Sequence, residues 1–124
     1  MKPTVLIVLA SISLSTVAFA EGDVKAGKKV FKKCKACHSL KEGNNKVGPT
    51  LYNIIGATAG TNPDFRYSGA MAESGVVWDV DTLAAFLTNP KDVIPDTSMA
   101  FGGLKKTEQV DDLIAYLQSE SEAN

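Results

Sequence analysis

Apolar positions with a helical period open the part of the chain that follows its N-terminal hydrophobic run. Lysines occupy most of the positions between them, and Asp23 stands where an N-cap residue is expected. The pattern predicts a helix over residues 23–35. Gly27 lies on the apolar stripe, where a glycine lowers helix stability, so we expect another helix to approach closely there. The stripe consists of Val24, Gly27, Val30, Phe31 and Cys34.

A second periodic stretch lies near the C-terminus. Its apolar residues follow the i, i+3, i+4, i+7 spacing of one helix face. Thr107 is the expected N-cap, and the helix is expected to end at about Ser119. This helix is the natural partner for the Gly27 face. The apolar residues are Val110, Leu113, Ile114 and Leu117.

Shorter helices are predicted between these two. One spans 67–74, with Ser68 at its start and Gly75 at its end. Asp79 or Asp81 caps another that runs to Thr88, and Pro90 to Pro95 leaves room for one more turn. Residues 95–103 have no period and are expected to form an extended loop. No alternating strand pattern occurs, so the fold class is all-α: a small single domain of about five helices with long loops.

The first twenty residues have the pattern of a secretory signal peptide. An apolar run begins at Val5, Ala18-Phe19-Ala20 matches an A-x-A cleavage site, and the chain turns polar at Glu21. The run is too short and too interrupted by serines for a confident membrane span. We therefore expect residues 1–20 to be removed, leaving one domain over 21–124. An uncleaved N-terminal anchor is the alternative.

The chemistry of the chain is concentrated at Cys34-Lys35-Ala36-Cys37-His38. Both cysteines and the single histidine of the chain are in this segment. A structural zinc site needs four such ligands, a thioredoxin-like pair belongs near a βαβ unit, and a disulfide leaves His38 unexplained. The C-x-x-C-H spacing favours covalent haem attachment, with His38 as an axial ligand. The Pro49 carbonyl suits the other ring nitrogen of His38, although a Gly-Pro pair alone is more often a turn.

The ligand opposite His38 cannot be a second histidine. Met71 falls on a predicted helix and is interpreted as filling a gap in the core. Met99 lies in the proline-bounded loop, far from Cys34 in sequence, and can reach the other haem face. We predict Met99 as the second axial ligand, because a thioether stabilises ferrous haem. A lysine ligand or an open site remains the alternative.

The chain resembles a class I cytochrome c, of the mitochondrial and bacterial cytochrome c2 type. The resemblance covers nearly all of 21–124. It rests on Gly22-Asp23-Val24, Cys34-Lys35-Ala36-Cys37-His38, Gly48-Pro49-Thr50-Leu51, Val77-Trp78, Asn89-Pro90-Lys91, Ile94-Pro95-Asp96-Thr97-Ser98-Met99-Ala100-Phe101 and Asp112-Leu113-Ile114-Ala115-Tyr116-Leu117.

The resemblance implies one haem c, bound through Cys34 and Cys37 and ligated by His38 and Met99, with the helices and loops wrapped around it. It implies that the Pro49 carbonyl accepts the ring proton of His38. By the same resemblance, Tyr67 and Trp78 bond a buried haem propionate and Thr97 lies near the other. Phe101 covers the haem face near its exposed edge.

Two positions depart from the family pattern. Ala57 stands where many relatives have an arginine beside the buried propionate, and Phe86 where a tyrosine often bonds the methionine sulfur. We expect both to change the reduction potential rather than the fold.

The function that the resemblance implies is a soluble periplasmic one-electron carrier, not an enzyme. It would shuttle between membrane complexes, from a cytochrome bc-type donor to a terminal oxidase or a photosynthetic reaction centre. The alternatives are a haem enzyme or a gas or peroxide sensor with a labile sixth ligand, and a membrane-tethered cytochrome subunit.

Charge is informative mainly through its distribution. The formal net charge of −1 does not suggest a nucleic-acid partner. Residues 25–46 are rich in lysine, whereas from Glu108 onward all charged residues are acidic. We expect a monomer that is not inserted in a membrane after cleavage and that docks redox proteins at a lysine-ringed haem edge. By the resemblance, this ring consists of Lys33, Lys46, Lys91, Lys105 and Lys106.

Overall fold

The computed structural model describes residues 1–3, 11–13 and 22–122. The predicted cleavage site at Ala18–Ala20 lies outside the described residues, so the signal-peptide interpretation stays a prediction. In the part of the chain that is described, none of the helices combines the length and the apolar character that crossing a membrane requires.

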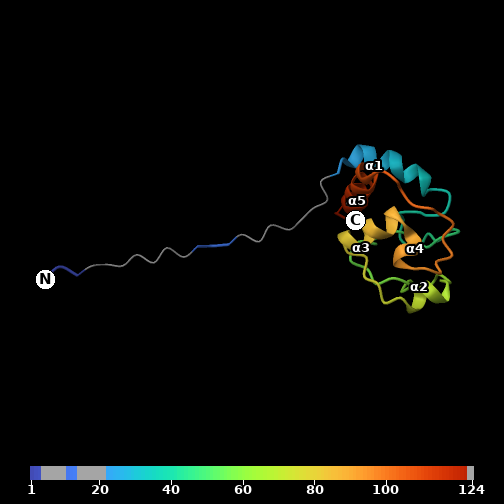
Figure 1. The fold of residues 1–124 in the computed structure, drawn as a ribbon, viewed down its shortest axis with the longest axis horizontal. Helices are drawn as coiled ribbons and strands as arrows, with labels where there is room; N and C mark the ends of the chain where they lie inside the picture. The colour runs from blue at the N-terminus through green and yellow to red at the C-terminus, as the bar shows by residue number, and fades with distance from the viewer. Residues whose placement is uncertain (4–10, 14–21, 123–124) are drawn as a thin grey trace.

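The described fold is helical, which confirms the predicted all-α class. Figure 1 shows the helices joined by long loops, with α1 and α5 next to each other and α2 far from α5. Across residues 22–122 the only β-type pairing is an isolated antiparallel bridge between Thr58 and Val77. In chain order the elements are α1 (Val24–Val30), the 3₁₀ helix η1 (Phe31–Lys33), α2 (Gly69–Glu73), α3 (Val80–Thr88), α4 (Pro90–Val93) and α5 (Thr107–Glu122).

The first helix starts where predicted but ends earlier. The Asp23 side chain accepts a hydrogen bond from the backbone N–H of Ala26 at 2.9 Å, as an N-cap should. The α-helix ends at Val30 and tightens into η1, so the prediction of a helix through Lys35 was wrong at its C-terminal end. The reason is physical: 3₁₀ turns have nearly the same apolar spacing as an α-helix over so few residues, and spacing alone does not separate them.

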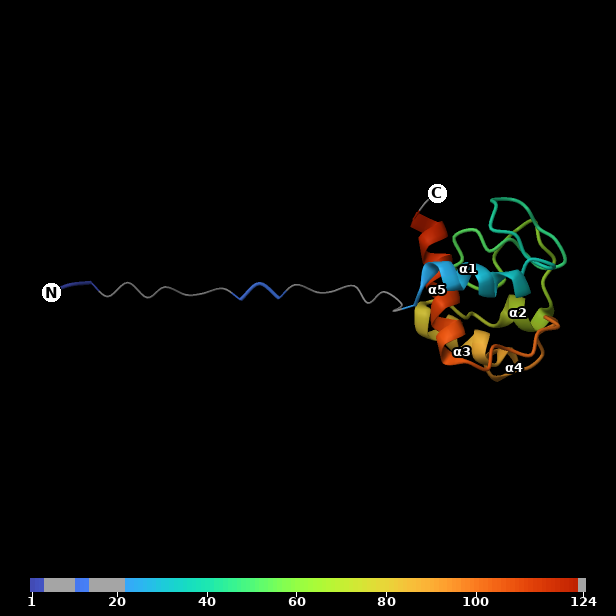
Figure 2. The same ribbon diagram turned by 90° about the horizontal axis from the view of Figure 1, so that it is seen from above.

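The ends of the domain are joined by the crossing of α1 and α5 (Figure 2). A Cβ atom at Gly27 would lie 1.9 Å from the carbonyl oxygen of Asp112 and 2.7 Å from Cβ of Tyr116. The crossing therefore requires a glycine at this position, as expected from its place on the apolar stripe. The rings of Phe31 and Tyr116 meet beside it, with centroids 5.7 Å apart.

A hydrogen bond between the two helices adds to this packing. The Asp23 backbone N–H donates to Oδ1 of Asp112 at 2.7 Å. The start of α1 is therefore bonded from both sides, by the side chain of its own cap residue and by a carboxylate of α5.

The remaining helices follow their predicted signals closely. Ser68 caps α2 and Asp79 caps α3, each through a side-chain oxygen that accepts a backbone N–H. The last helix begins at Thr107 itself and reaches Glu122, so the predicted N-cap was one position late and the predicted end was short. Side chains of α1, η1, α3 and α5 form much of the buried core, which includes Val30, Phe31, Leu83, Phe86, Leu87, Val110, Leu113, Ile114 and Leu117.

Candidate haem site

A cavity of about 740 Å³ lies between α3, α5 and the long loops. Its lining is mainly apolar, and its volume is within the range of about 300–1,000 Å³ that is typical of cofactor pockets. Every site residue predicted from the sequence lines this one cavity. These residues are Cys34, Cys37, His38, Pro49, Tyr67, Trp78, Thr97, Met99 and Phe101.

The His38 ring is fixed from two sides. Its Nδ1 lies 2.7 Å from the carbonyl oxygen of Pro49, and because that oxygen can only accept, Nδ1 carries the proton and donates. The Nε2 atom is then left with a lone pair. Gly48 lies against the ring: a Cβ at this position would be 2.3 Å from Cε1 of His38, so the loop can approach this closely only with a glycine.

Tight turns place the two cysteines next to this histidine. The backbone N–H groups of Cys37 and His38 both donate to the carbonyl oxygen of Cys34, at 3.1 and 2.8 Å. Cys34 is half-buried and Cys37 is exposed, and both are free thiols. Burial raises the pKa of the Cys34 thiol, Cys37 adds to the rise, and Lys33 opposes it.

Met99 enters the cavity from the loop that follows α4. The loop is held by the Thr97 backbone N–H, which donates to the Ile94 carbonyl at 3.0 Å, and by Oγ1 of Thr97, which accepts from the Met99 N–H at 3.3 Å. Met71 was interpreted as a core residue. It is half-buried, packs against the core from outside, and lines the same cavity as Met99.

The aromatic residues of the cavity are held by the chain around them. Trp78 is 5% exposed, and the centroids of its ring and the Phe86 ring lie 4.7 Å apart. The peptide N–H of Trp78 donates to the Ala57 carbonyl at 2.8 Å, which places Ala57 beside it. The Tyr67 hydroxyl oxygen accepts the backbone N–H of Asn62 at 3.2 Å.

Asn45 is part of a hydrogen-bond network that the sequence did not reveal. Its Oδ1 accepts from the backbone N–H of Thr50 at 2.9 Å and from Nδ2 of Asn62 at 3.0 Å. Its Nδ2 donates to the carbonyl oxygen of Asp64 at 3.2 Å. The segment was interpreted only as a loop, and no pattern in the sequence pairs Asn45 with residues so distant along the chain.

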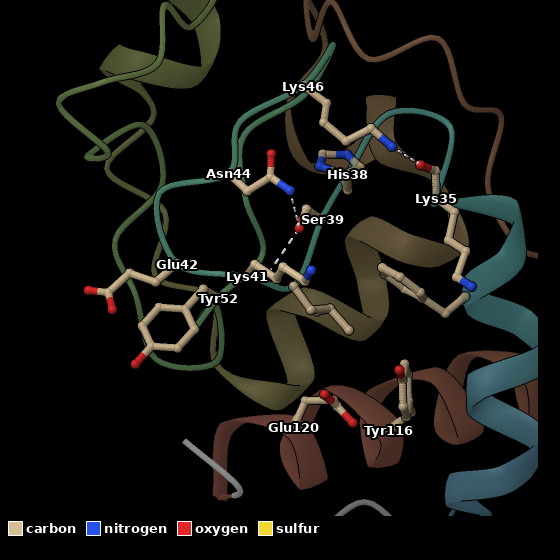
Figure 3. A pocket seen from close by; sticks show the side chains of 12 residues that line it. Lys35, His38, Ser39, Lys41, Glu42, Asn44, Lys46, Tyr52, Tyr116 and Glu120 are labelled. Atoms are coloured by element: carbon tan, nitrogen blue, oxygen red, sulfur yellow. Dashed lines mark hydrogen bonds between the residues drawn. The ribbon is translucent and has the colours of Figure 1, made fainter.

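The lysines of the predicted ring are all exposed, but only Lys33 lines the cavity. A second, more open pocket of about 800 Å³ lies on the side of His38 that faces α5 (Figure 3). Lys46 lines it, and its ammonium donates to the carbonyl oxygen of Lys35. Tyr116 and Glu120 of α5 lie at the base of this pocket. Burial raises the pKa of Tyr116, and Glu120 adds to the rise.

The cavity residues fit a covalently attached haem. They comprise two thiols three positions apart, an imidazole with one nitrogen uncommitted, and thioether side chains, in an apolar cavity of suitable volume. Each donor is of a type that haem chemistry uses.

Comparisons with known proteins agree with this fit. The cytochrome c family model matches residues 24–121. Cytochrome c2 from Agrobacterium tumefaciens (strain II Chrys) is 52% identical over 101 residues, which cover 78% of this chain and 91% of that protein. Cytochrome c from Stellaria longipes is 47% identical over 104 residues, covering 82% and 96%.

A solved structure is similar along the same region. Cytochrome cH from Methylobacterium extorquens superimposes with a TM-score of 0.75 and 43% sequence identity, covering 79% of this chain and 99% of that chain. Family model, relatives and structure point to the same fold and the same attachment chemistry. The chain belongs to the cytochrome c family, whose members carry covalently bound haem c.

Proposed function

We propose that this protein is an exported one-electron carrier that shuttles electrons between membrane redox complexes. The observation that carries the proposal is that His38, Met99 and both cysteines line one mainly apolar cavity. When bound, haem c supplies an iron centre that holds or releases one electron. The chain's own residues fix the group, shield it from water and set its potential.

Each of the predicted site residues has a role in this proposal. Cys34 and Cys37 would hold the haem through thioethers, and His38 and Met99 would ligate its iron. The bond from His38 to Pro49 fixes the ring and leaves Nε2 free to ligate the iron. Tyr67, Trp78 and Thr97 bond the propionates, and Phe101, which is half-buried, covers the exposed edge.

A carrier suits this cavity better than an enzyme does. If both His38 and Met99 ligate the iron, no position would be left there for a substrate. The charged residues that line the cavity are Lys33, Glu42 and Asp64, all of them exposed. Exposed groups of this kind keep ordinary solvation and are poor candidates for a tuned acid–base pair.

The site of action follows from the N-terminal sequence. Residues 1–20 direct export to the periplasm and are removed, which leaves a monomer that is not inserted in the membrane. Mass spectrometry of the exported protein tests this step. A mass that begins at Glu21 is expected, whereas retention of residues 1–20 would make the protein a tethered cytochrome subunit.

Docking uses the exposed lysines near the haem edge. The donor is a cytochrome bc-type complex, and the acceptor is a terminal oxidase or a photosynthetic reaction centre. Opposite charges speed such encounters, and salt screens them. Electron transfer to oxidase-containing membranes should therefore slow as salt rises. A rate that is indifferent to salt would contradict docking by charge.

Charge reversal locates the docking surface. Lys91→Glu should reduce the rate at low salt by about tenfold, a size typical of steering effects. Lys25→Glu, in the first turn of α1 and outside both the predicted lysine ring and the cavity lining, makes the same change of charge and should leave the rate near that of the wild type. Equal losses in both variants would show that only the net charge matters.

A further inference from the structure

The peptide group between Pro49 and Thr50 is hydrogen-bonded at both ends. Its carbonyl oxygen accepts from Nδ1 of His38 at 2.7 Å, and its N–H donates to Oδ1 of Asn45 at 2.9 Å. The two ends belong to one planar, conjugated unit. The bond at the N–H end therefore polarises the carbonyl and makes it a better acceptor.

We propose that Asn45 is a positioning residue for His38, acting through the Pro49–Thr50 peptide. The proposal rests on the ligation by His38 proposed above. A stronger acceptor draws the Nδ1 proton away from the ring and makes the Nε2 lone pair a stronger donor. A stronger donor favours the ferric state and lowers the reduction potential.

The remaining bonds of Asn45 extend this link to the Tyr67 side of the cavity. Its Oδ1 also accepts from Nδ2 of Asn62 at 3.0 Å, and its Nδ2 donates to the Asp64 carbonyl at 3.2 Å. The Asn62 backbone N–H donates to the Tyr67 hydroxyl at 3.2 Å. Asn45 therefore ties the loop that holds His38 to the loop that holds Tyr67.

Partial burial strengthens the hydrogen bond from the Thr50 N–H to Oδ1 of Asn45. Asn45 and Thr50 are both partly buried, and the bonds from Thr50 and Asn62 to Oδ1 are partly sheltered from solvent. A sheltered hydrogen bond is electrostatically stronger than one in water. The neighbouring Asn44 is exposed, and its side chain donates to Oγ of Ser39 at 3.0 Å. Because that bond does not involve the Pro49–Thr50 peptide, Asn44 offers a matched control.

The test uses the haem-loaded protein labelled with ¹⁵N. Two quantities are measured: the chemical shift and exchange rate of the His38 Nδ1 proton, and the reduction potential. Asn45→Ala should move the Nδ1 proton upfield, speed its exchange by about tenfold, and raise the potential. Asn44→Ala should change none of these. An Asn45→Ala variant with an unmoved Nδ1 signal and potential would overturn the proposal.

Two further variants separate positioning from mere loop stability. Asn62→Ala removes one of the two loop-to-loop bonds, that from Nδ2 of Asn62 to Oδ1 of Asn45, but keeps the acceptor for Thr50. The Nδ1 shift of His38 in this variant should therefore stay close to the wild-type value. An equal Nδ1 shift in Asn62→Ala and Asn45→Ala would overturn the proposal in favour of a structural role.

Asn45→Asp keeps an accepting oxygen and serves if the alanine variant fails to fold. A carboxylate accepts more strongly, so the potential should fall further than in Asn44→Asp, which adds the same charge one residue away. Equal potentials in the two variants would overturn the proposal. If the oxidised wild type lacked paramagnetically shifted His38 signals, the ligation itself would be overturned. If the wild type shows those signals but the Asn45 variants have the wild-type Nδ1 signal and potential, only the role of Asn45 is overturned.

Discussion

Gly48 offers a test of how tightly His38 is held. In Gly48→Ala the new Cβ would lie 2.3 Å from Cε1 of the ring, so the ring or the loop must move. We expect a loss of about 1–3 kcal/mol in the free energy of unfolding, the usual cost of overpacking, together with an altered Nδ1 signal of His38. Thermal unfolding and NMR measure the two effects.

Gly102→Ala is the matched control, since a Cβ at that position would meet nothing within 4 Å. A Gly48→Ala variant as stable as Gly102→Ala would contradict the close packing of His38 against the loop.

Ala57, which lies beside Trp78, stands where many relatives have an arginine, and replacing it tests what that departure does to the haem. Ala57→Arg places a cation next to the cavity, and a nearby positive charge favours the ferrous state over the ferric one. We expect a higher reduction potential with little change in melting temperature. Redox titration checks the first quantity and thermal unfolding the second. A potential equal to that of the wild type would refute the role assigned to this departure from the family pattern.

The sequence predicted some of the cavity-lining residues and missed others. The segment from Cys34 to His38 indicated its own chemistry, because few arrangements use two thiols and an adjacent imidazole. The acceptor role of the Pro49 carbonyl was also predicted, and its geometry is present at 2.7 Å. The hydrogen bonds of Asn45 and the position of Met71 in the cavity lining were not predicted, because both depend on contacts between distant loops.

At the scale of helices, periodicity and caps predicted the starts well. Asp23 was predicted as an N-cap, Ser68 as the start of a helix, and Asp79 as one of two candidate caps beside Asp81. These signals can be read from sequence because capping is a local interaction. Ends were predicted less well, as α1 and α5 show, because a helix can tighten or continue according to its packing. The long loop at 95–103 was expected, and its distance from Cys34 along the chain already suggested that Met99 could reach the far side of the site; residues 97–101 of this loop line the cavity.

The crossing of α1 and α5 depends on Gly27. Gly27→Ala would place a Cβ 1.9 Å from the Asp112 carbonyl oxygen, and backbone cannot yield as a flexible side chain does. We expect the free energy of unfolding to fall by about 3 kcal/mol, measured by denaturant titration. Gly69→Ala in α2, where a Cβ meets nothing within 4 Å, should be neutral or slightly stabilising. Equal stability of the two variants would contradict the packing described.

The Asp79 cap gives α3 a stability that depends on pH. Its carboxylate accepts the Thr82 N–H at 2.8 Å, and this bond lowers its pKa below the usual value of 3.8. The folded state therefore binds this proton less readily than the unfolded state. The stabilisation is complete above the unfolded pKa and is lost as the pH falls through the folded pKa.

The corresponding variant is Asp79→Ala. Its melting temperature should lie below that of the wild type at pH 7, and the gap should narrow once the pH falls below 3.8. Asp79→Asn, which keeps a neutral accepting oxygen, should lose less at pH 7. A gap between wild type and Asp79→Ala that is constant with pH would contradict the role of the charged cap.

Over the whole molecule, the residues of the candidate haem site were predicted better than the positions of the surface lysines. Local motifs and the family resemblance named residues that all line one cavity. The five lysines of the predicted docking ring are all exposed, but only Lys33 among them lines the cavity. The ammonium of Lys46 donates instead to the carbonyl oxygen of Lys35. Where a long, solvated side chain points depends on small energies that sequence patterns do not encode.

The optical spectrum of the purified protein tests the central claim most directly, namely a haem c held by Cys34 and Cys37 and ligated by His38 and Met99. It is recorded in the reduced and oxidised states, and the haem is then challenged by acid–acetone extraction. We predict that the haem stays with the protein, that the oxidised form shows the weak near-red methionine–iron band, and that Met99→Ala loses that band. Haem that is extracted would contradict covalent attachment, and a missing band with ready binding of carbon monoxide would contradict the His38–Met99 pair.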